Sequence, residues 1–300
     1  GNTVALIGID KCIEKTASIT DASNSSFFVK EMSFAVSPVV QVAIEAVKAV
    51  DIPKVVQAIR KLSKSDTTLV CNTSDFGENT LAACGELHMQ VSLEMLETMF
   101  LQGVKVKVSN PVVKYNETIT EASSEVSLVK SSNKLNRLWM KASPTDEAVM
   151  EALKTVTMDL TTKREALEGF LRNKGGWSVH DARRVWFMDE RGNMLINSTS
   201  SVQNLAEIKG SLKSAFEQVC RNGLLVEEPL NGVTFELVDA MVHSDAPHRG
   251  ASQIIPAARR AFLASLVCAS PVLLEPFFEI EVSGPDDALR AVYGIVSQRR

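Results

Sequence analysis

The spacing of apolar residues between positions 37 and 110 changes period in a fixed order, and this order restricts the fold more than any other feature of the chain. Alternating apolar and polar residues over 40–45 predict a half-buried strand. After Asp51, apolar residues recur at the spacing of one helix face as far as Leu62. A strand, a second strand, a helix and a last strand are predicted at 67–71, 79–84, 86–95 and 104–108. The order strand–helix–strand–strand–helix–strand is that of a ferredoxin-like split βαβ domain.

Residues 111–270 form a longer segment that predicts a second, larger α+β domain. Its expected strands lie at 112–118, 124–129, 138–142 and 233–241, and its expected helices at 146–155, 162–173, 202–221 and 255–270. Two loops rich in polar and charged residues, 130–137 and 243–253, each follow a predicted strand. We therefore expect both loops to project from one end of the domain.

The two ends of the chain differ from its middle. Residues 4–20 alternate without a helical period and predict strands, followed by a polar linker at 21–26. The last thirty residues predict one strand, 276–282, and one helix around Leu289, Val292 and Val296. One strand and one helix cannot bury their own apolar faces, and Gly1 begins the chain without a signal pattern. We expect a piece of a longer protein with an incomplete domain at each end.

Composition excludes several classes of function. The 32 basic and 36 acidic residues give a net charge of −4, so no global positive field attracts nucleic acid and any RNA contact has to be local. The most apolar stretch, 261–274, is interrupted by Ser265, Ser270 and Pro271 and is too short to cross a membrane. Five cysteines without a CxxC pair fit a reducing compartment. We expect a cytoplasmic protein with no membrane or DNA partner.

Two of the four histidines lie in one loop, His243-Ser244-Asp245-Ala246-Pro247-His248-Arg249-Gly250. His243, Asp245 and His248 offer nitrogen and oxygen donors of the kind that bind a metal, which leaves a metal-dependent hydrolase as one interpretation. No cysteine lies nearby to complete the set. The other interpretation is a polar turn, made rigid by Pro247, that precedes the helix at Ile255.

The other loop carries three basic residues among small polar ones, and either contacts phosphates or is an ordinary solvated loop. Its polar residues are Lys130, Ser131, Ser132, Asn133, Lys134, Asn136 and Arg137. The run Asn133-Lys134-Leu135-Asn136 is similar to the element with which GTPases read guanine, but its last residue lacks the required carboxylate. The chain also has no GxxxxGK(S/T) motif, so it does not bind GTP by that route.

The remaining candidates are interpreted as structural. The run Gly85-Glu86-Leu87-His88 opens the second helix of the first domain, and His88 has no nucleophile beside it in sequence. Trp139, Trp177 and Trp186 are irregularly spaced, so we interpret them as core or surface anchors rather than as a stacking platform. We assign neither a catalytic residue nor a metal ligand.

Several stretches together resemble the elongation factor 2 family of ribosomal translocation GTPases, over the full length of the chain. They occur in the family's order: Ser37-Pro38-Val39-Val40-Gln41-Val42-Ala43, Leu62-Ser63-Lys64-Ser65-Asp66, Gly85-Glu86-Leu87-His88, Gly176-Trp177 with Asp181-Ala182-Arg183, and His248-Arg249-Gly250 with Gln253-Ile254-Ile255-Pro256. The ordered set carries the resemblance, since no single stretch is decisive. The paralogous spliceosomal and ribosome-maturation GTPases share these folds, and we expect them to lack the modifiable histidine loop. The chain departs from the family's usual Gly-Gly or Pro-Ala at Ala251-Ser252.

The resemblance implies an α+β, multidomain chain with four parts. These are the end of a β-barrel domain II at 1–21, a ferredoxin-like domain III at 22–110, a domain IV similar to ribosomal protein S5 at 111–270, and the start of a second ferredoxin-like domain V at 271–300. It also implies that domain IV enters the decoding centre of the ribosome, with its two loops at the tip. The residues expected to contact messenger and transfer RNA are Lys130, Ser131, Ser132, Asn133, Lys134, Asn136, Arg137, His243, Asp245, His248 and Arg249.

The same resemblance implies a modification and a set of partners. His248 matches the histidine that the family converts to diphthamide, so diphthamide-synthesis enzymes are implied partners besides ribosomal, messenger and transfer RNA. The intact family member hydrolyses GTP with Mg, whereas this chain is expected to hold no cofactor and to have no active site of its own. It is expected to be a monomer.

Overall fold

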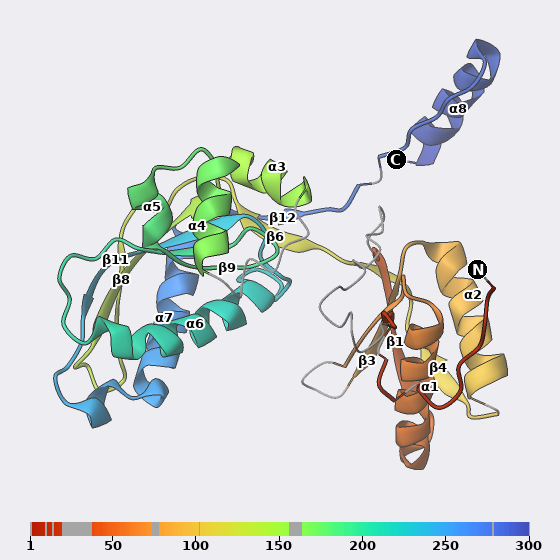
Figure 1. The fold of residues 1–300 in the computed structure, drawn as a ribbon, viewed down its shortest axis with the longest axis horizontal. Coiled ribbons are helices and arrows are strands. Elements are labelled where there is room, and N and C mark those ends of the chain that lie inside the picture. Colours follow the sequence, from red (N-terminus) through yellow and green to blue (C-terminus); the bar gives the residue numbers. More distant parts are fainter. Residues whose placement is uncertain are drawn as a thin grey trace.

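The computed structural model describes residues 2–9, 11–13, 15–19, 38–73, 78–101, 103–155, 164–277 and 279–299. Figure 1 shows two lobes, each a sheet with helices against it, and a helix near the C-terminus that stands apart from both. The predicted linker at 21–26 lies outside the described residues. None of the described helices is long and apolar enough to cross a membrane.

The first lobe has the predicted order of strands and helices. Its elements are β1 (Val40–Ala46), α1 (Ile52–Ser65), β2 (Val70–Thr73), β3 (Asn79–Ala83), α2 (Glu86–Met95) and β4 (Val106–Val108), with short helical turns at Ala49–Asp51 and Leu96–Phe100. The strands pair in the order β2-β3-β1-β4, and every pair is antiparallel. The short strand β5 (Val112–Val113) also pairs with β1. This arrangement confirms the ferredoxin-like prediction.

The core of this lobe lies between the sheet and its helices. The residues of α1 that recur at helical spacing, Val55, Ala58, Ile59 and Leu62, are the ones that the helix buries. They pack against the inward side chains of the two central strands, which include Val42, Ile44 and Leu81. The apolar faces that the sequence pattern predicts for the strands and helices therefore pack against each other, which gives the lobe two layers.

The second lobe is built on a five-stranded sheet with the order β7-β8-β11-β10-β9. Its strands are β7 (Ser127–Lys130), β8 (Arg137–Pro144), β9 (Val185–Met188), β10 (Met194–Asn197) and β11 (Val233–Met241). β10 and β11 are parallel because the helix that connects them, α6 (Leu205–Arg221), returns the chain to the same end of the sheet, and the other neighbours are antiparallel. Neither β9 nor β10 was predicted from the sequence.

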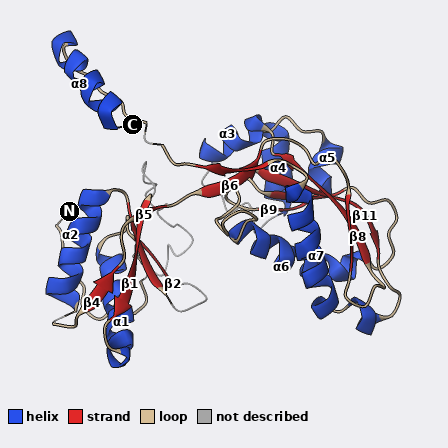
Figure 2. Cartoon of the chain, turned by 180° about the vertical axis from the view of Figure 1, so that it is seen from behind, coloured by secondary structure: helices blue, strands red, loops and turns tan. Residues whose placement is uncertain are grey.

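Helices cover this sheet in two groups (Figure 2). The larger core lies against α6 and α7 (Ala251–Val267), where Phe216, Phe235 and Phe262 meet edge to face. A smaller core involves α3 (Glu147–Thr155), α4 (Arg164–Asn173) and α5 (Val179–Arg184), together with β9 and β10. On β8, the residues at alternate positions, Leu138, Met140 and Ala142, are buried in the larger core. Arg137, Trp139, Lys141 and Ser143 face away from that core.

The two ends depart from the prediction. The described residues among 2–19 form no strand, in contrast to the strands predicted at 4–20. Val4, Leu6 and Ile7 are exposed there, whereas Lys15 Nζ donates to the carbonyls of Thr67 and Leu69 in the first lobe. The described residues of 276–282 form no strand either.

A strand does form just before the predicted segment 276–282. β12 (Pro271–Leu274) pairs with β6 (Asn116–Ile119) of the second lobe, because β6 offers a free edge. The helix predicted around Leu289, Val292 and Val296 is confirmed as α8 (Asp286–Arg299). The domain limits expected at residues 21, 110 and 270 stay predictions.

A buried carboxylate on β6 organises the loop that follows α6. Glu117 is 1% exposed and accepts four backbone N–H groups. Its Oε2 accepts from Leu224 at 2.6 Å and from Leu225 at 2.8 Å, and its Oε1 accepts from Val226 at 2.9 Å and from Glu228 at 3.2 Å. A carboxylate can accept at both oxygens, whereas an amide cannot.

We predict that Glu117→Gln lowers the free energy of unfolding of the second lobe by about 2 kcal/mol, since the new amide group turns N–H toward N–H. Trp139, Trp177 and Trp186 all lie in this lobe, so urea unfolding followed by tryptophan fluorescence measures its stability. The exposed Glu125 provides the control, and Glu125→Gln should change stability by less than about 0.5 kcal/mol. Equal stability of the two variants would contradict the assignment.

Candidate functional site

The two predicted loops lie together at one end of the second lobe. The first connects β7 to β8, and the second connects β11 to α7 through a short 3-10 turn, η4 (Ala246–Arg249). They meet because Arg137 at the start of β8 pairs with Lys130 of β7 on one side and with Met241 of β11 on the other. The ends of β8 and β11 that lead into the loops are at the lower left of Figure 1. We call the two loops together the tip.

Side-chain amides join the two loops. The Asn136 Oδ1 accepts from the backbone N–H of His243 at 3.0 Å, and its Nδ2 donates to the carbonyl of His248 at 2.8 Å. The Asn133 Nδ2 donates to the same carbonyl at 2.8 Å. The Gln253 Oε1, in turn, accepts from the backbone N–H of Asn133 at 3.2 Å. The tip is therefore one hydrogen-bonded unit rather than two independent loops.

Two residues that the sequence analysis assigns to RNA contact are in the interior of the tip. Ser131 is 2% exposed and Asn136 is 1% exposed. The Ser131 Oγ accepts from the Asn136 backbone N–H at 3.0 Å, closing the hairpin, and Lys134 sits in its bend with a positive φ of 61°. Both side chains are buried among other residues of the tip in this structure, and RNA contact by these two residues stays a prediction. Their role is to hold the loops together.

Arg249 is held by contacts inside the lobe. Its Nε donates to Oε2 of Glu207 in α6 at 2.8 Å, and a second guanidinium nitrogen, Nη2, lies 2.5 Å from the same oxygen. Its Nη1 donates to the carbonyls of His243 and Ser244. With a side chain only 10% exposed, the guanidinium ties the loop to the start of α6 instead of standing free toward RNA.

The remaining predicted residues form the accessible surface of the tip. Lys130, Ser132, Lys134, Asp245 and His248 are exposed, and Asn133, Arg137 and His243 are partly buried. The His248 ring lies edge-on to the His243 ring, with centroids 5.0 Å apart. The tip thus presents two lysines and an imidazole on a fixed frame.

The metal-site interpretation does not gain support from this geometry. The His243 Nδ1 accepts from the backbone N–H of Asp245 at 3.1 Å, so this ring nitrogen is already used. In the part of the chain that the structure describes, no three His, Cys, Asp or Glu side chains are grouped to hold a metal ion. His243, Asp245 and His248 therefore do not form a ligand set for the hydrolase alternative.

The motif Gly85-Glu86-Leu87-His88 in the first lobe positions one histidine. The His88 Nδ1 accepts from the Cys84 backbone N–H at 3.3 Å, so its Nε2 carries the proton that is shared with Asp66 Oδ2 at 2.8 Å. Asp66 also accepts from the N–H and the hydroxyl of Thr68. Partial burial raises the pKa of Asp66, but the hydrogen bonds from Thr68 and His88 outweigh it and leave this pKa below 3.8. The pair connects α1 to α2 and is structural.

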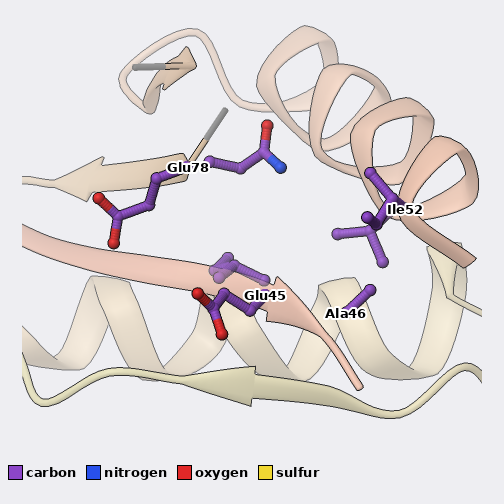
Figure 3. Close-up of a pocket in the computed structure, with 7 residues that line it drawn as sticks. Glu45, Ala46, Ile52 and Glu78 are labelled. Atoms are coloured by element: carbon purple, nitrogen blue, oxygen red, sulfur yellow. The ribbon is translucent and has the colours of Figure 1, made fainter. Parts of the chain in front are cut away.

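A cavity in the first lobe offers no catalytic pair. It has a volume of about 220 Å³ and lies between β1, the start of α1 and the residues that lead into β3. Figure 3 shows Glu45 and Glu78 at one side of it and Ile52 at the other. Carboxylates and aliphatic groups make up most of its lining, and no nucleophile lies beside a base among its lining residues.

We predict that Asp66→Asn destabilises the first lobe by about 1 kcal/mol at neutral pH through the lost hydrogen bonds. Because the folded pKa is lowered, the wild-type contribution is present above 3.8 and is lost as pH falls through the lower folded value. The two proteins should therefore converge in acid. Hydrogen exchange of β1 and β3 amides across this pH range measures the effect. The exposed ion pair Asp51–Lys54 supplies the control variant Asp51→Asn, and a constant difference at all pH values would contradict the assignment.

Comparison with known protein families assigns both lobes. The family model described as elongation factor G, domain III, matches residues 36–110, which include the whole ferredoxin-like sheet from β1 to β4. The family model described as elongation factor G, domain IV, matches residues 154–270, which include β9 to β11, α6, α7 and one of the two loops of the tip. Together the two matches span more than half of the chain, and they occur in the order of the family. The chain belongs to the elongation factor G and elongation factor 2 family of translation factors.

Proposed function

We propose that this chain is part of an elongation factor 2 that promotes GTP-dependent translocation of tRNA and mRNA, and that its tip enters the decoding centre of the ribosome. The observation that carries the proposal is the tip itself, in which buried amides lock two loops into one unit. A surface that is ordered before binding spends little free energy on ordering when it docks. A factor that acts by occupying a position needs a rigid end.

The charge of the tip supports an RNA partner. The chain as a whole is acidic, with a net charge of −4, but Lys130 and Lys134 are exposed at the tip. Phosphate contacts position a protein on RNA, and a few local cations suffice for that role. We propose ribosomal, messenger and transfer RNA as the partners, and cytoplasm as the compartment.

The presentation of His248 supports the elongation factor 2 branch. Its backbone carbonyl is held by two amides, from Asn133 and Asn136, while its ring is exposed to an enzyme. We propose that His248 is the diphthamide residue and that diphthamide-synthesis enzymes act on it. The sequence His248-Arg249-Gly250 also favours this branch over the spliceosomal and ribosome-maturation paralogues.

GTP and Mg are proposed for the intact factor and not for these residues. A phosphate-binding loop requires a glycine-rich GxxxxGK(S/T) segment, and the chain has none. The residues of this chain therefore do not fit the nucleotide, and we assign them no step of its hydrolysis. Their proposed contribution is positioning, by a factor that is a monomer.

We predict that Lys130→Ala combined with Lys134→Ala slows single-round translocation about tenfold in the factor that carries this chain, since each lysine donates charge-assisted hydrogen bonds to phosphate. Lys213→Ala on α6 is the matched control, because it removes a lysine of the same lobe away from the tip. Equal rates for the double variant and the control would contradict the proposal.

We predict further that His248 carries the diphthamide adduct when the protein is produced in its native host. Intact-peptide mass spectrometry measures the added mass. His248→Ala should change the free energy of unfolding by less than about 0.5 kcal/mol, as expected of an exposed position, and should abolish ADP-ribosylation by the toxins that use the adduct. An unmodified His248 in every molecule rejects this prediction.

A further inference from the structure

One face of the second lobe's sheet carries an aromatic residue between two cations. Arg137, Trp139 and Lys141 alternate with Leu138, Met140 and Ala142 along β8, and the latter three are buried in the larger core. Alternate residues of a strand point to opposite sides of the sheet, so the first three share the other face. Arg137 and Lys141 lie about 13 Å apart along the strand, with Trp139 midway.

The neighbouring strand extends this surface. In the register of β7 and β8, Lys130 is opposite Arg137 and Leu128 is opposite Trp139. We call these five residues, Leu128, Lys130, Arg137, Trp139 and Lys141, the Trp139 face. It begins at the tip and continues away from it along the sheet.

The side chains of the Trp139 face are accessible or lack partners. Leu128 is 47% exposed, and Trp139 is only partly buried and lies outside both hydrophobic cores of the lobe. The Arg137 Nε is shielded from solvent and makes no hydrogen bond with any described residue. Arg137 as a whole is only partly buried, so the rest of its guanidinium group can meet a partner at the surface.

The carboxylates near this face leave it cationic. Asp239 of β11 pairs in register with Trp139 and accepts the N–H of Ala240 at 2.8 Å. Glu236 is opposite Lys141, but Arg184 lies 3.4 Å from its Oε1 and Ser198 donates to the same oxygen. Lys130, Arg137 and Lys141 therefore lie beside two carboxylates of β11, Asp239 and Glu236, and Glu236 shares Arg184 with Asp181.

We propose that the Trp139 face binds unpaired RNA, with a base stacked on Trp139 and the flanking phosphates on Lys130, Arg137 and Lys141. An aromatic ring between cations on a sheet surface is the arrangement with which single-stranded nucleic acid is bound without base reading. Leu128 and Trp139 form one small apolar pair, with Lys130 and Arg137 on one side of it and Lys141 beyond Trp139, so cations border most of the apolar area that a protein partner could use. This proposal rests on the proposed function, which it extends from the tip loops to the sheet and to two residues, Trp139 and Lys141, outside the tip.

Binding of a fluorescein-labelled single-stranded oligouridylate to the full chain, followed by fluorescence anisotropy over a salt series, tests this proposal. Trp139→Leu should weaken binding about tenfold, and Trp139→Tyr, which keeps a stacking ring, should restore most of it. Lys141→Ala should lower the slope of log affinity against log salt by about one, whereas Lys213→Ala should leave it unchanged. Asp239→Asn should tighten binding. A duplex RNA should bind without dependence on Trp139.

The outcomes separate this proposal from the proposed function. Wild-type affinity for the oligouridylate in both Trp139→Leu and Lys141→Ala would overturn the RNA-binding proposal and would favour a protein partner for the Trp139 face. The fluorescence of the other tryptophans verifies that the variants are folded. The same conclusion follows if the wild-type chain does not bind the oligouridylate at all. The translocation rate of a Lys134→Ala variant decides the proposed function independently, because Lys134 is exposed at the tip and is not part of the Trp139 face.

Discussion

The tip depends on one buried amide. Asn136 donates to the carbonyl of His248 and accepts the N–H of His243, so a side chain of the hairpin loop fixes both ends of the turn that precedes α7. Both polar groups of the amide are satisfied inside the protein, which makes their burial favourable and specifies one arrangement. This arrangement fixes the loops that carry the exposed residues of the tip, which include Lys134 and His248. Arg249 and Glu207 add a second tie, from the same turn to α6.

Much of the fold follows from the spacing of apolar residues along the chain. The elements that were not predicted are those that this spacing does not mark. The first lobe was predictable because each strand and helix shows its own period, as α1 does with Val55, Ile59 and Leu62. β9 and β10 are short apolar runs buried on both faces, so they show neither alternation nor a helical period. The segment at 276–282 has strand-like spacing without a strand to pair with, and the chain uses β12 instead because β6 is available to it.

The candidate site was predictable in position but not in the use of each residue. Polar loops after two strands locate the tip, but the sequence does not say which polar groups are satisfied internally. In sequence, all the polar residues of the two loops look alike, Lys134 included. In the structure, Ser131 and Asn136 are buried, and Arg249 forms an ion pair with Glu207. Glu117 gave no signal at all, because its four N–H donors lie more than a hundred positions away in sequence. Trp139 was interpreted as an anchor, although it lies at two-residue spacing between Arg137 and Lys141, and the burial of Leu138, Met140 and Ala142 shows that these three share the opposite face.

Hydrogen exchange in an Asn136→Ala variant tests the central claim, that the two loops are one unit joined through this amide. The account predicts that the backbone N–H of His243, which donates to Asn136 at 3.0 Å, and that of Asn133 lose protection together. The amides of Val42 and Ile44 in the first lobe should keep theirs, and the exposed Ser132→Ala should behave as wild type. Unchanged protection of His243 and Asn133 in the Asn136→Ala protein would contradict the account.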